Sequence, residues 1–412
     1  MIAQEPKMLV VQKFGGTSVA TPDRIRQVAS RVVEEKKAGR DVIVVVSAMG
    51  DTTDQLVTLA KTVTQNPPRR EMDMLLTAGE RISMALLSMA ISDLGCEAIS
   101  FTGSQSGIVT DTSHTRAKIL DVRAHRVKEE LDKGRIVIVA GFQGVSSAKE
   151  VTTLCRGGSD TTCVALAAAL SAGECHIFTD VDGVFTADPR LVPDARKIDR
   201  ISYEEMMELA FCGAGVLHWR SVDVARRFGV RVHVRSSFGK EAGTLVTNRE
   251  EIEAAEIKGI TQDAGVARIS LEASDDPAGA AGRLLALLDR ENVDVRFIHL
   301  HSPGPGGVSI MIPAEEEEAA RRAMAAAAPT DRFVLDEDVG TVSIVGQGPS
   351  GMHSVARKVL ASLAALGVRP DVMSTSGISL TVVLPRSALA EAVRRLHGDL
   401  GLAGPTRDEG PR

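Results

Sequence analysis

Short apolar runs alternate with helix-like stretches along the chain as far as about Val246. Residues 9–12 and 42–47 are apolar on both faces, and the amphipathic residues 23–37 lie between them. Residues 176–179 continue the pattern further along the chain. Strands that are apolar on both faces belong to sheets that helices cover on both sides. The sequence therefore predicts an α/β fold with a mainly parallel central sheet.

The sequence beyond this point carries an internal repeat. Residues 267–335 show the order strand–helix–strand–strand–helix–strand, and residues 341–400 show the same order without the last strand. Two such units are typical of small ferredoxin-like βαββαβ modules. The expected divisions are an α/β domain over residues 1–248, a linker over 249–262, one module over 263–337, a second over 338–403 and a disordered tail over 404–412.

The composition of the chain argues against nucleic acid and membranes as binding partners. The net charge is −6 and aromatic residues make up 3% of the 412 residues, which argues against a nucleic-acid-binding surface. The first residues lack the apolar segment of a signal peptide, and no apolar run is expected to reach membrane-spanning length. An odd number of cysteines without C-x-x-C spacing indicates reduced thiols in a cytoplasmic protein. These cysteines are Cys96, Cys155, Cys163, Cys175 and Cys212.

Three segments that follow expected strands are suited to bind phosphate groups. They are KFGGTS from Lys13, RGGSD from Arg156 and TDVDGVFTADPR from Thr179. The first two open helix-like stretches, whose N-terminal N–H groups attract anions. KFGGTS alone is equally compatible with a simple strand–turn–helix corner, and neither a P-loop nor a kinase-type glycine loop is present. The three segments together predict a nucleotide site with Mg²⁺.

Charged side chains in unusual settings add to this prediction. Glu80 lies in an otherwise small and apolar helix, so its carboxylate must be paired or face a cleft that holds a cation, unless it lies on a solvated face of the helix. Arg156 can bind a carboxylate through two hydrogen bonds. Asp160 either caps the helix that follows it or belongs to the site. Asp180 and its neighbours either form turns or contact the nucleotide and its metal.

Two other patterns are interpreted as structural. Residues 346–351 match the dinucleotide-binding fingerprint G-x-G-x-x-G, with Asp371 at about the expected distance. Too little chain remains to build a dinucleotide-binding sheet, so a tight turn in a small module is favoured. His299 and His301 share a strand face, but no third ligand is nearby in the sequence. We interpret them as the polar edge of a sheet rather than as a metal pair.

The motifs resemble those of the aspartate kinases of the amino-acid kinase family in order and spacing. The matching stretches are KFGGTSV, VVVSAMGDTTDQL, LLTAGERIS, TLCRGGSDTT, FTDVDGVFTADPR and RSVDVARRFGVRVHVRSSF, and the two repeats resemble the family's paired ACT modules. The resemblance covers nearly the whole chain. It implies an amino-acid-kinase-type sandwich followed by two ACT modules. The implied reaction converts ATP and L-aspartate to 4-phospho-L-aspartate and ADP, the first step toward lysine, threonine and methionine.

The resemblance also implies roles for individual residues. Lys13 would stabilise the transferring phosphoryl group and Asp160 would orient it. No general base is expected, because a β-carboxylate with a reference pKa of about 3.9 is already ionised at pH 7. Mg²⁺ would be held by the phosphates, with no metal ligand from the protein. The residues implied for aspartate are Ser47, Thr53, Glu80, Arg156, Gly157, Gly158 and Ser159, and those implied for ATP are Gly15, Gly16, Thr179, Asp180, Phe185, Arg190 and Gly215.

The sequence departs from the family at several positions. Gly215 stands where a lysine is usual, Phe185 stands where a tyrosine is common, and Trp219 follows His218. These changes predict weaker or altered ATP binding.

The repeats depart further, because Leu300–His301 replaces a Gln-Asn pair. Weak feedback by lysine and threonine is expected, which would suit a dedicated secondary pathway. An amino-acid effector at the ACT modules and self-association or association with another subunit through them are also expected. The alternatives are a regulatory or sensor subunit with little activity and a kinase for another acidic amino acid.

Overall fold

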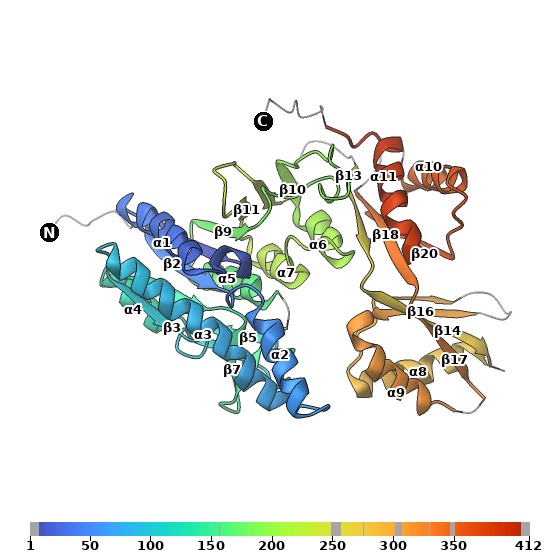
Figure 1. Ribbon diagram of the computed structural model, residues 1–412, viewed down its shortest axis with the longest axis horizontal. Helices are drawn as coiled ribbons and strands as arrows, with labels where there is room; N and C mark the ends of the chain where they lie inside the picture. The colour runs from blue at the N-terminus through green and yellow to red at the C-terminus, as the bar shows by residue number, and fades with distance from the viewer. Residues whose placement is uncertain are drawn as a thin grey trace. The chain divides into compact units, whose positions relative to one another are not determined.

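The computed structural model describes residues 8–155, 157–248, 257–274, 276–300, 307–328, 330–346 and 351–404. The chain forms two compact units. In Figure 1 the first is coloured from blue to green and the second from yellow to red, except that two short green segments, Phe185–Arg196 and Cys212–Ala214, belong to the second unit. The first unit comprises Met1–Val184, Lys197–Phe211 and Gly215–Glu253, and the second comprises Phe185–Arg196, Cys212–Ala214 and Ala254–Arg412.

An eight-stranded sheet forms the centre of the first unit, in the order β10-β12-β11-β9-β1-β2-β6-β3. Every neighbouring pair is parallel except β11 and β12. The predicted mainly parallel sheet is therefore confirmed. Its strands are β1 (Leu9–Phe14), β2 (Asp41–Val46), β3 (Ala98–Phe101), β6 (Ile136–Ala140), β9 (Glu174–Thr179), β10 (Arg200–Ser202), β11 (Val232–Ser236) and β12 (Thr244–Thr247).

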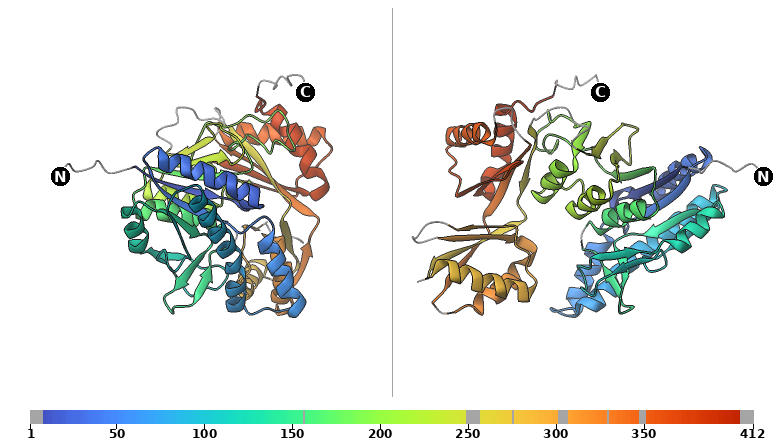
Figure 2. Two further views of the ribbon diagram at one scale, coloured as in Figure 1. Left: turned by 60° about the vertical axis from the view of Figure 1, so that its left-hand side comes forward. Right: turned by 180° about the vertical axis from the view of Figure 1, so that it is seen from behind.

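Helices cover both faces of this sheet. On one face α1 (Pro22–Lys37) and α3 (Arg69–Asp93) lie side by side, and their apolar residues share a buried cluster with Phe14 and Phe178. On the other face α5 (Gly158–Ala169) contacts β1 and β9 and packs against α7 (Trp219–Phe228). The strands alternate their side chains between these two layers, which explains why they are apolar on both sides. Both layers are visible in Figures 1 and 2.

Smaller elements complete the first unit. A second sheet has the order β5-β4-β7-β8. Its strands are β4 (Ile108–Thr110), β5 (Ile119–Val122), β7 (Gln143–Ser146) and β8 (Val151–Thr153), and the remaining helices are α2 (Thr52–Val63), α4 (His125–Asp132) and α6 (Tyr203–Phe211).

Helix α3 is long and apolar enough, by length and composition alone, to cross a membrane. This differs from the expectation that no apolar run reaches such a length. Leu87 and Ile91 are fully buried in the cluster beneath the helix. The core of the domain therefore explains the apolar residues on one side of α3, whereas Ile82 and Met89 are exposed.

Two four-stranded sheets form the second unit, as the repeat predicts. The first has the order β15-β16-β14-β17 and the second the order β13-β18-β20-β19. The first module consists of β14 (Val266–Ala273), α8 (Pro277–Glu291), β15 (Phe297–Leu300), β16 (Val308–Pro313), α9 (Glu317–Ala325) and β17 (Arg332–Asp336). The second consists of β18 (Val339–Gly346), α10 (Met352–Ala365), β19 (Val372–Thr375), β20 (Ser379–Pro385) and α11 (Leu389–Asp399).

The second module takes its fourth strand from the segment that we expected to be a linker. Strand β13 (Ile257–Asp263) pairs antiparallel with β18, and Ile260 is buried in the core of this module. No strand follows α11 as far as residue 404, the last that the structure describes, and β13 covers the edge of β18 that would otherwise be open. The linker prediction is therefore wrong for residues 257–262, while residues 249–256 lie outside the described part of the chain. The expected tail lies there too, apart from Gly404.

Candidate active site

A buried ion pair lies at the carboxyl end of β1. Lys13 Nζ is 2.6 Å from Asp160 Oδ1, and the two side chains are only 13% and 8% exposed. The second carboxylate oxygen of Asp160 accepts a hydrogen bond from the backbone N–H of His218 at 3.3 Å. The strand β1 and the first turn of α5 thus present an ammonium group whose position is fixed by a carboxylate.

The glycine corner after β1 brings backbone close to this ammonium. A Cβ atom at Gly15 would lie 3.5 Å from Lys13 Nζ. A Cβ at Gly16 would lie 3.0 Å from the carbonyl oxygens of Ala48 and Gly50, in the loop that follows β2. Gly50 N donates to Gly16 O at 3.0 Å, which holds the two loops together. Gly16 therefore allows a close approach of the two loops that a side chain would crowd, whereas a Cβ at Gly15 would be at ordinary contact distance.

The RGGSD segment forms the N-terminus of α5. Gly157 has a φ of 76°, and a Cβ there would lie 2.3 Å from the Cβ of His218, so only glycine suits this position. Gly157 is the N-cap residue, and no side chain caps the helix. Asp160 lies within the first turn and pairs with Lys13, so the capping alternative for Asp160 is not what the structure shows. Ser159 and Gly158 are buried, and Arg156 lies outside the described residues.

Glu80 is a buried carboxylate with spare hydrogen-bonding capacity. Glu80 is 3% exposed, and its Oε1 accepts a hydrogen bond from the backbone N–H of Ala48 at 3.3 Å. No partner is present for Oε2 among the residues that the structure describes. Burial raises the pKa of Glu80 to about 7. The solvated-helix alternative is thus excluded, and the carboxylate is suited to a cationic ligand.

The loop after β2 lies beside Glu80. Ser83 Oγ donates to Ser47 O at 2.7 Å, and a Cβ at Gly79 would lie 2.7 Å from that of Ala48. Helix α3 therefore approaches this loop closely because position 79 has no side chain. Thr53 is half-buried in the first turn of α2, on the same loop.

The expected nucleotide residues Thr179 and Asp180 are the last residue of β9 and the residue after it. Thr179 Oγ1 donates to Asp180 Oδ1 at 3.1 Å, and Thr179 O accepts from Ser237 N at 2.8 Å. Ser237 Oγ in turn hydrogen-bonds to Ser18 Oγ, just after the glycine corner. Neither serine was predicted individually as a site residue, although Ser18 lies in the KFGGTS motif and Ser237 in RSSF.

The other expected nucleotide residues have different surroundings. Phe185 and Arg190 belong to the second unit, where Arg190 makes a bidentate pair with Asp188 (2.7 Å between Nη2 and Oδ2). Gly215 is exposed, and a Cβ there would meet no atom within 4 Å. The position therefore has room for a larger side chain.

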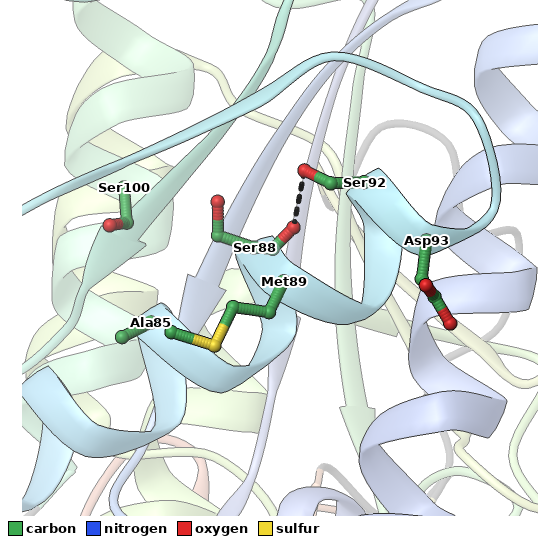
Figure 3. A pocket seen from close by; sticks show the side chains of 6 residues that line it. All are labelled: Ala85, Ser88, Met89, Ser92, Asp93 and Ser100. Carbon is green, nitrogen blue, oxygen red and sulfur yellow. Dashed lines mark hydrogen bonds between the residues drawn. The ribbon is translucent and has the colours of Figure 1, made fainter.

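No group of three or more His, Cys, Asp or Glu residues that could hold a metal occurs in the described ranges. A shallow groove elsewhere, shown in Figure 3, is lined by Ala85, Ser88, Met89, Ser92 and Asp93 of α3 and by Ser100 of β3. Ser92 Oγ donates to Ser88 O at 3.0 Å there. Met89 lies about 13 Å along the helix from Glu80 at 1.5 Å per residue. The groove therefore offers neither the cation nor the glycine corner of the site above.

Comparison with known proteins finds relatives that match nearly the whole chain. The amino acid kinase family model matches residues 8–236, and an ACT domain model matches residues 342–400. An aspartokinase of Mycolicibacterium smegmatis is 47% identical over 407 residues, which are 96% of this chain and 97% of that protein. The Corynebacterium glutamicum aspartokinase is 48% identical over 408 residues, with the same two shares.

A solved structure extends the likeness to the whole fold. The crystal structure of E. coli aspartokinase III in complex with aspartate and ADP (R-state) superposes with a TM-score of 0.82 at 25% identity. The match covers 95% of this chain and 99% of that one. The predicted sandwich followed by ACT modules is confirmed. The chain therefore belongs to the amino acid kinase family and, within it, to the aspartokinases.

Proposed function

We propose that this aspartate kinase transfers the γ-phosphoryl group of ATP to the β-carboxylate of L-aspartate with Lys13 and Asp160 as its catalytic pair. The observation that carries the proposal is the 2.6 Å pair between Lys13 Nζ and Asp160 Oδ1 beside the glycine corner. The reacting carboxylate is already ionised, so no proton has to be removed. The barrier is repulsion between two anions, which a fixed ammonium and backbone N–H groups reduce.

Glu80 and the start of α5 are proposed to hold aspartate. The unpartnered, buried Oε2 of Glu80 would accept hydrogen bonds from the α-ammonium group of the substrate. Ser47 and Thr53 would contact the same molecule from the loop after β2. The substrate carboxylates would be bound by Arg156 and by the backbone at Gly157, Gly158 and Ser159.

The nucleotide is proposed to contact Gly15, Gly16, Thr179 and Asp180, and Phe185, Arg190 and Gly215 keep the roles that the resemblance implies. A Mg²⁺ ion is proposed to enter the site with the nucleotide, bound to its phosphates. Such an ion would neutralise charge on the triphosphate. The E. coli enzyme's structure with aspartate and ADP supports both ligands.

Regulation and context complete the proposal. We propose weak or absent feedback by lysine and threonine, a role in amino-acid biosynthesis or a dedicated secondary pathway, a cytoplasmic location and association through the ACT modules. Synergistic inhibition by both amino acids at millimolar levels would contradict the weak feedback.

A second candidate, a sensor subunit with little activity, is favoured by one observation. Gly215 supplies no ammonium group at a position where the family usually has one. Such a subunit would bind ligands at its modules but would turn over aspartate slowly or not at all.

An ADP-release assay with L-aspartate distinguishes the two candidates. The wild type is expected to be active, and Lys13→Ala is expected to lose activity by at least about a hundredfold. Lys36→Ala is the matched control, because it removes a similar ion pair outside the proposed site. Lys36 Nζ lies 2.9 Å from Asp41 Oδ1 at the start of β2, whereas the glycine corner contacts the loop at the end of β2. Equal activity of both variants would overturn the catalytic role of Lys13. A panel of other acidic amino acids in the same assay tests the substrate.

A further inference from the structure

The side chain of Thr186 is fully buried inside the second unit, where its hydroxyl group makes three hydrogen bonds. Its Oγ1 lies 2.9 Å from His397 Nε2, accepts from Arg196 N at 2.9 Å and donates to Leu402 O at 3.3 Å. A hydroxyl has one hydrogen to donate, so His397 must donate through Nε2–H. Burial lowers the pKa of His397, which favours this neutral form. All of the hydrogen-bonding capacity of Thr186 is used.

The backbone around Thr186 is fixed as firmly as its side chain. Thr186 N donates to Arg196 O at 2.9 Å, and Ile260 N of β13 donates to Thr186 O at 2.7 Å. A Cβ at Gly259 would lie 3.0 Å from the same carbonyl oxygen. The glycine at this position therefore lets β13 lie close to the backbone of Thr186. These bonds make a short ribbon from residues 186–196 and attach it to the sheet of the second module.

The ribbon also contributes to the core of that module. Ala187 and Val192 are buried in one cluster with residues of α10, α11 and the sheet, including Leu396. Gly404 N donates to Asp194 O at 3.0 Å, so the segment that follows α11 is attached to the ribbon as well. A segment that lies in the middle of the kinase sequence is thus part of the C-terminal module's interior.

Phe185 stands between two residues that are held by different units. Val184 belongs to the first unit, where its N–H donates to Thr244 Oγ1 at 2.8 Å and its carbonyl accepts from Ile198 N at 2.8 Å. Thr186 belongs to the second unit and is held by His397. The backbone that carries Phe185 therefore depends on contacts made by the last helix, α11.

We propose that Thr186 and His397 are positioning residues for the nucleotide, because their hydrogen bond fixes the segment that carries Phe185 and Arg190. ATP affinity and the integrity of the second module are thereby linked. The inference rests on the proposed nucleotide contacts of those two residues. It assigns to α11 a part in ATP binding, although α11 lies about 200 residues after the segment in sequence.

Thr186→Val tests the inference, because valine keeps the shape of the side chain and removes its hydroxyl. The Nε2–H of His397 and the N–H of Arg196 would lose their acceptor. Calorimetry is expected to show about tenfold weaker MgATP binding, and the KM for ATP is expected to rise about tenfold, the size of effect that one of the three lost hydrogen bonds would cause. The KM for aspartate is expected to change less than about twofold. Thr186→Ser, which keeps the hydroxyl, is expected to restore both values.

Ser343→Ala is the matched control, since Ser343 Oγ makes a 2.8 Å hydrogen bond to Thr381 Oγ1, between β18 and β20 of the same sheet rather than to the ribbon. It is expected to lower thermal stability without changing MgATP affinity. An equal loss of ATP affinity in Ser343→Ala, or an unchanged affinity in Thr186→Val, would overturn the positioning role.

Phe185→Ala and Arg190→Ala separate this result from the proposed function. If they weaken ATP binding and Thr186→Val does not, only the positioning role fails. If none of the three weakens ATP binding, the proposed nucleotide contacts of Phe185 and Arg190 fail as well, and the inference falls with them.

Discussion

The carboxylate of Glu80 accepts one hydrogen bond, from the backbone N–H of Ala48 at 3.3 Å, while its second oxygen is buried without a partner in the described part of the chain. Burial raises the pKa of this group to about 7. An unpaired buried carboxylate destabilises the ligand-free protein, and a cationic ligand removes that cost. Glu80 therefore links stability, pH and substrate binding.

Glu80→Gln is expected to stabilise the ligand-free protein at pH 8. The pKa of about 7 lies above the ordinary value of 4.5, so the folded protein holds a proton that the unfolded chain releases between these values. Stability falls as the pH rises through this window, by on the order of 3 kcal/mol for a shift of this size. Urea unfolding of both proteins at pH 4.5 and pH 8 measures the difference. If the wild type and the variant have the same pH dependence, Glu80 does not carry this cost.

Aspartate binding near pH 7 is expected to release protons. About half of the Glu80 carboxyls are protonated when the pH equals a pKa of about 7. Pairing with the substrate's ammonium group favours the ionised form, so up to about half a proton leaves per molecule bound. Calorimetry in buffers of different ionisation enthalpy measures this number. Glu80→Gln is the control, and proton release that persists in it would assign the effect to another group.

Asp160→Asn is expected to lower kcat by on the order of a hundredfold while the affinity for ATP changes little. In the wild type Asp160 Oδ1 lies 2.6 Å from Lys13 Nζ and holds it in position. The variant removes the negative charge of this pair. Steady-state kinetics with separate determination of ATP binding measure the two effects. Asp41→Asn weakens the ion pair with Lys36 at the start of β2 and is expected to leave kcat unchanged. A fall in ATP affinity alone would argue that Lys13 acts only in binding.

Gly215→Lys is expected to lower the KM for ATP by about tenfold or more, because a charged hydrogen bond contributes roughly 1.5–3 kcal/mol. No atom lies within 4 Å of a Cβ at this position, so the first carbon of the lysine side chain needs no rearrangement of its neighbours. Gly282→Lys in α8, which also has open space around it, is the control and is expected to have no effect. An unchanged KM in both would show that this site binds ATP without a lysine at position 215.

The local features of the site were predictable from sequence. Lys13, Gly15 and Gly16 follow an apolar strand, and this order alone places an ammonium group next to a flexible corner. The role of Asp160 stayed open, because an acidic residue in the first turn of a helix also suits a cap. Its pairing with Lys13 depends on the side-by-side placement of β1 and α5, which are separated by more than a hundred residues of sequence. That placement leaves no periodic pattern in the chain.

Contacts between distant segments account for the expectations that differed. β13 reads IKGITQD, a short and partly polar stretch, and its partner β18 comes about 80 residues later. Ser18 and Ser237 meet because β1 and β11 both flank β9, a neighbour relation that the sequence does not state. Thr186 looked like one more residue of a nucleotide motif, and its bond to His397 spans 211 residues. In each case the partner, and not the segment itself, determines the structure.

A row of polar side chains crosses the centre of the sheet. Gln12 of β1, His176 of β9 and His233 of β11 are register partners, and the rings of the two histidines stack with centroids 5.6 Å apart. Gln12 is fully buried, and neither its amide nor His176 Nδ1 has a partner in the described structure. His176 Nε2 lies 3.0 Å from Glu174 Oε2, which fits a neutral ring that donates from Nε2.

This row is expected to make the protein sensitive to acid. Burial, followed by the charges of His233, Arg235, Arg40 and Arg31, lowers the pKa of His176 to about 3. The unfolded chain binds this proton near the ordinary value of 6.5 and the folded protein does not, so stability is lost as the pH falls from 6.5 toward 3. The full loss is on the order of 4 kcal/mol, and Glu174 would reduce it.

His176→Gln is expected to remove much of this acid sensitivity, because the amide has a similar polarity and does not titrate. Urea unfolding at pH 7 and pH 4.5 is expected to show a smaller loss of stability on acidification in the variant than in the wild type. Glu80 changes stability in the opposite direction over the same range, but it is present in both proteins and cancels in the comparison. A wild type and a variant that lose stability equally would show that His176 is accommodated as a cation, with Glu174 as its partner.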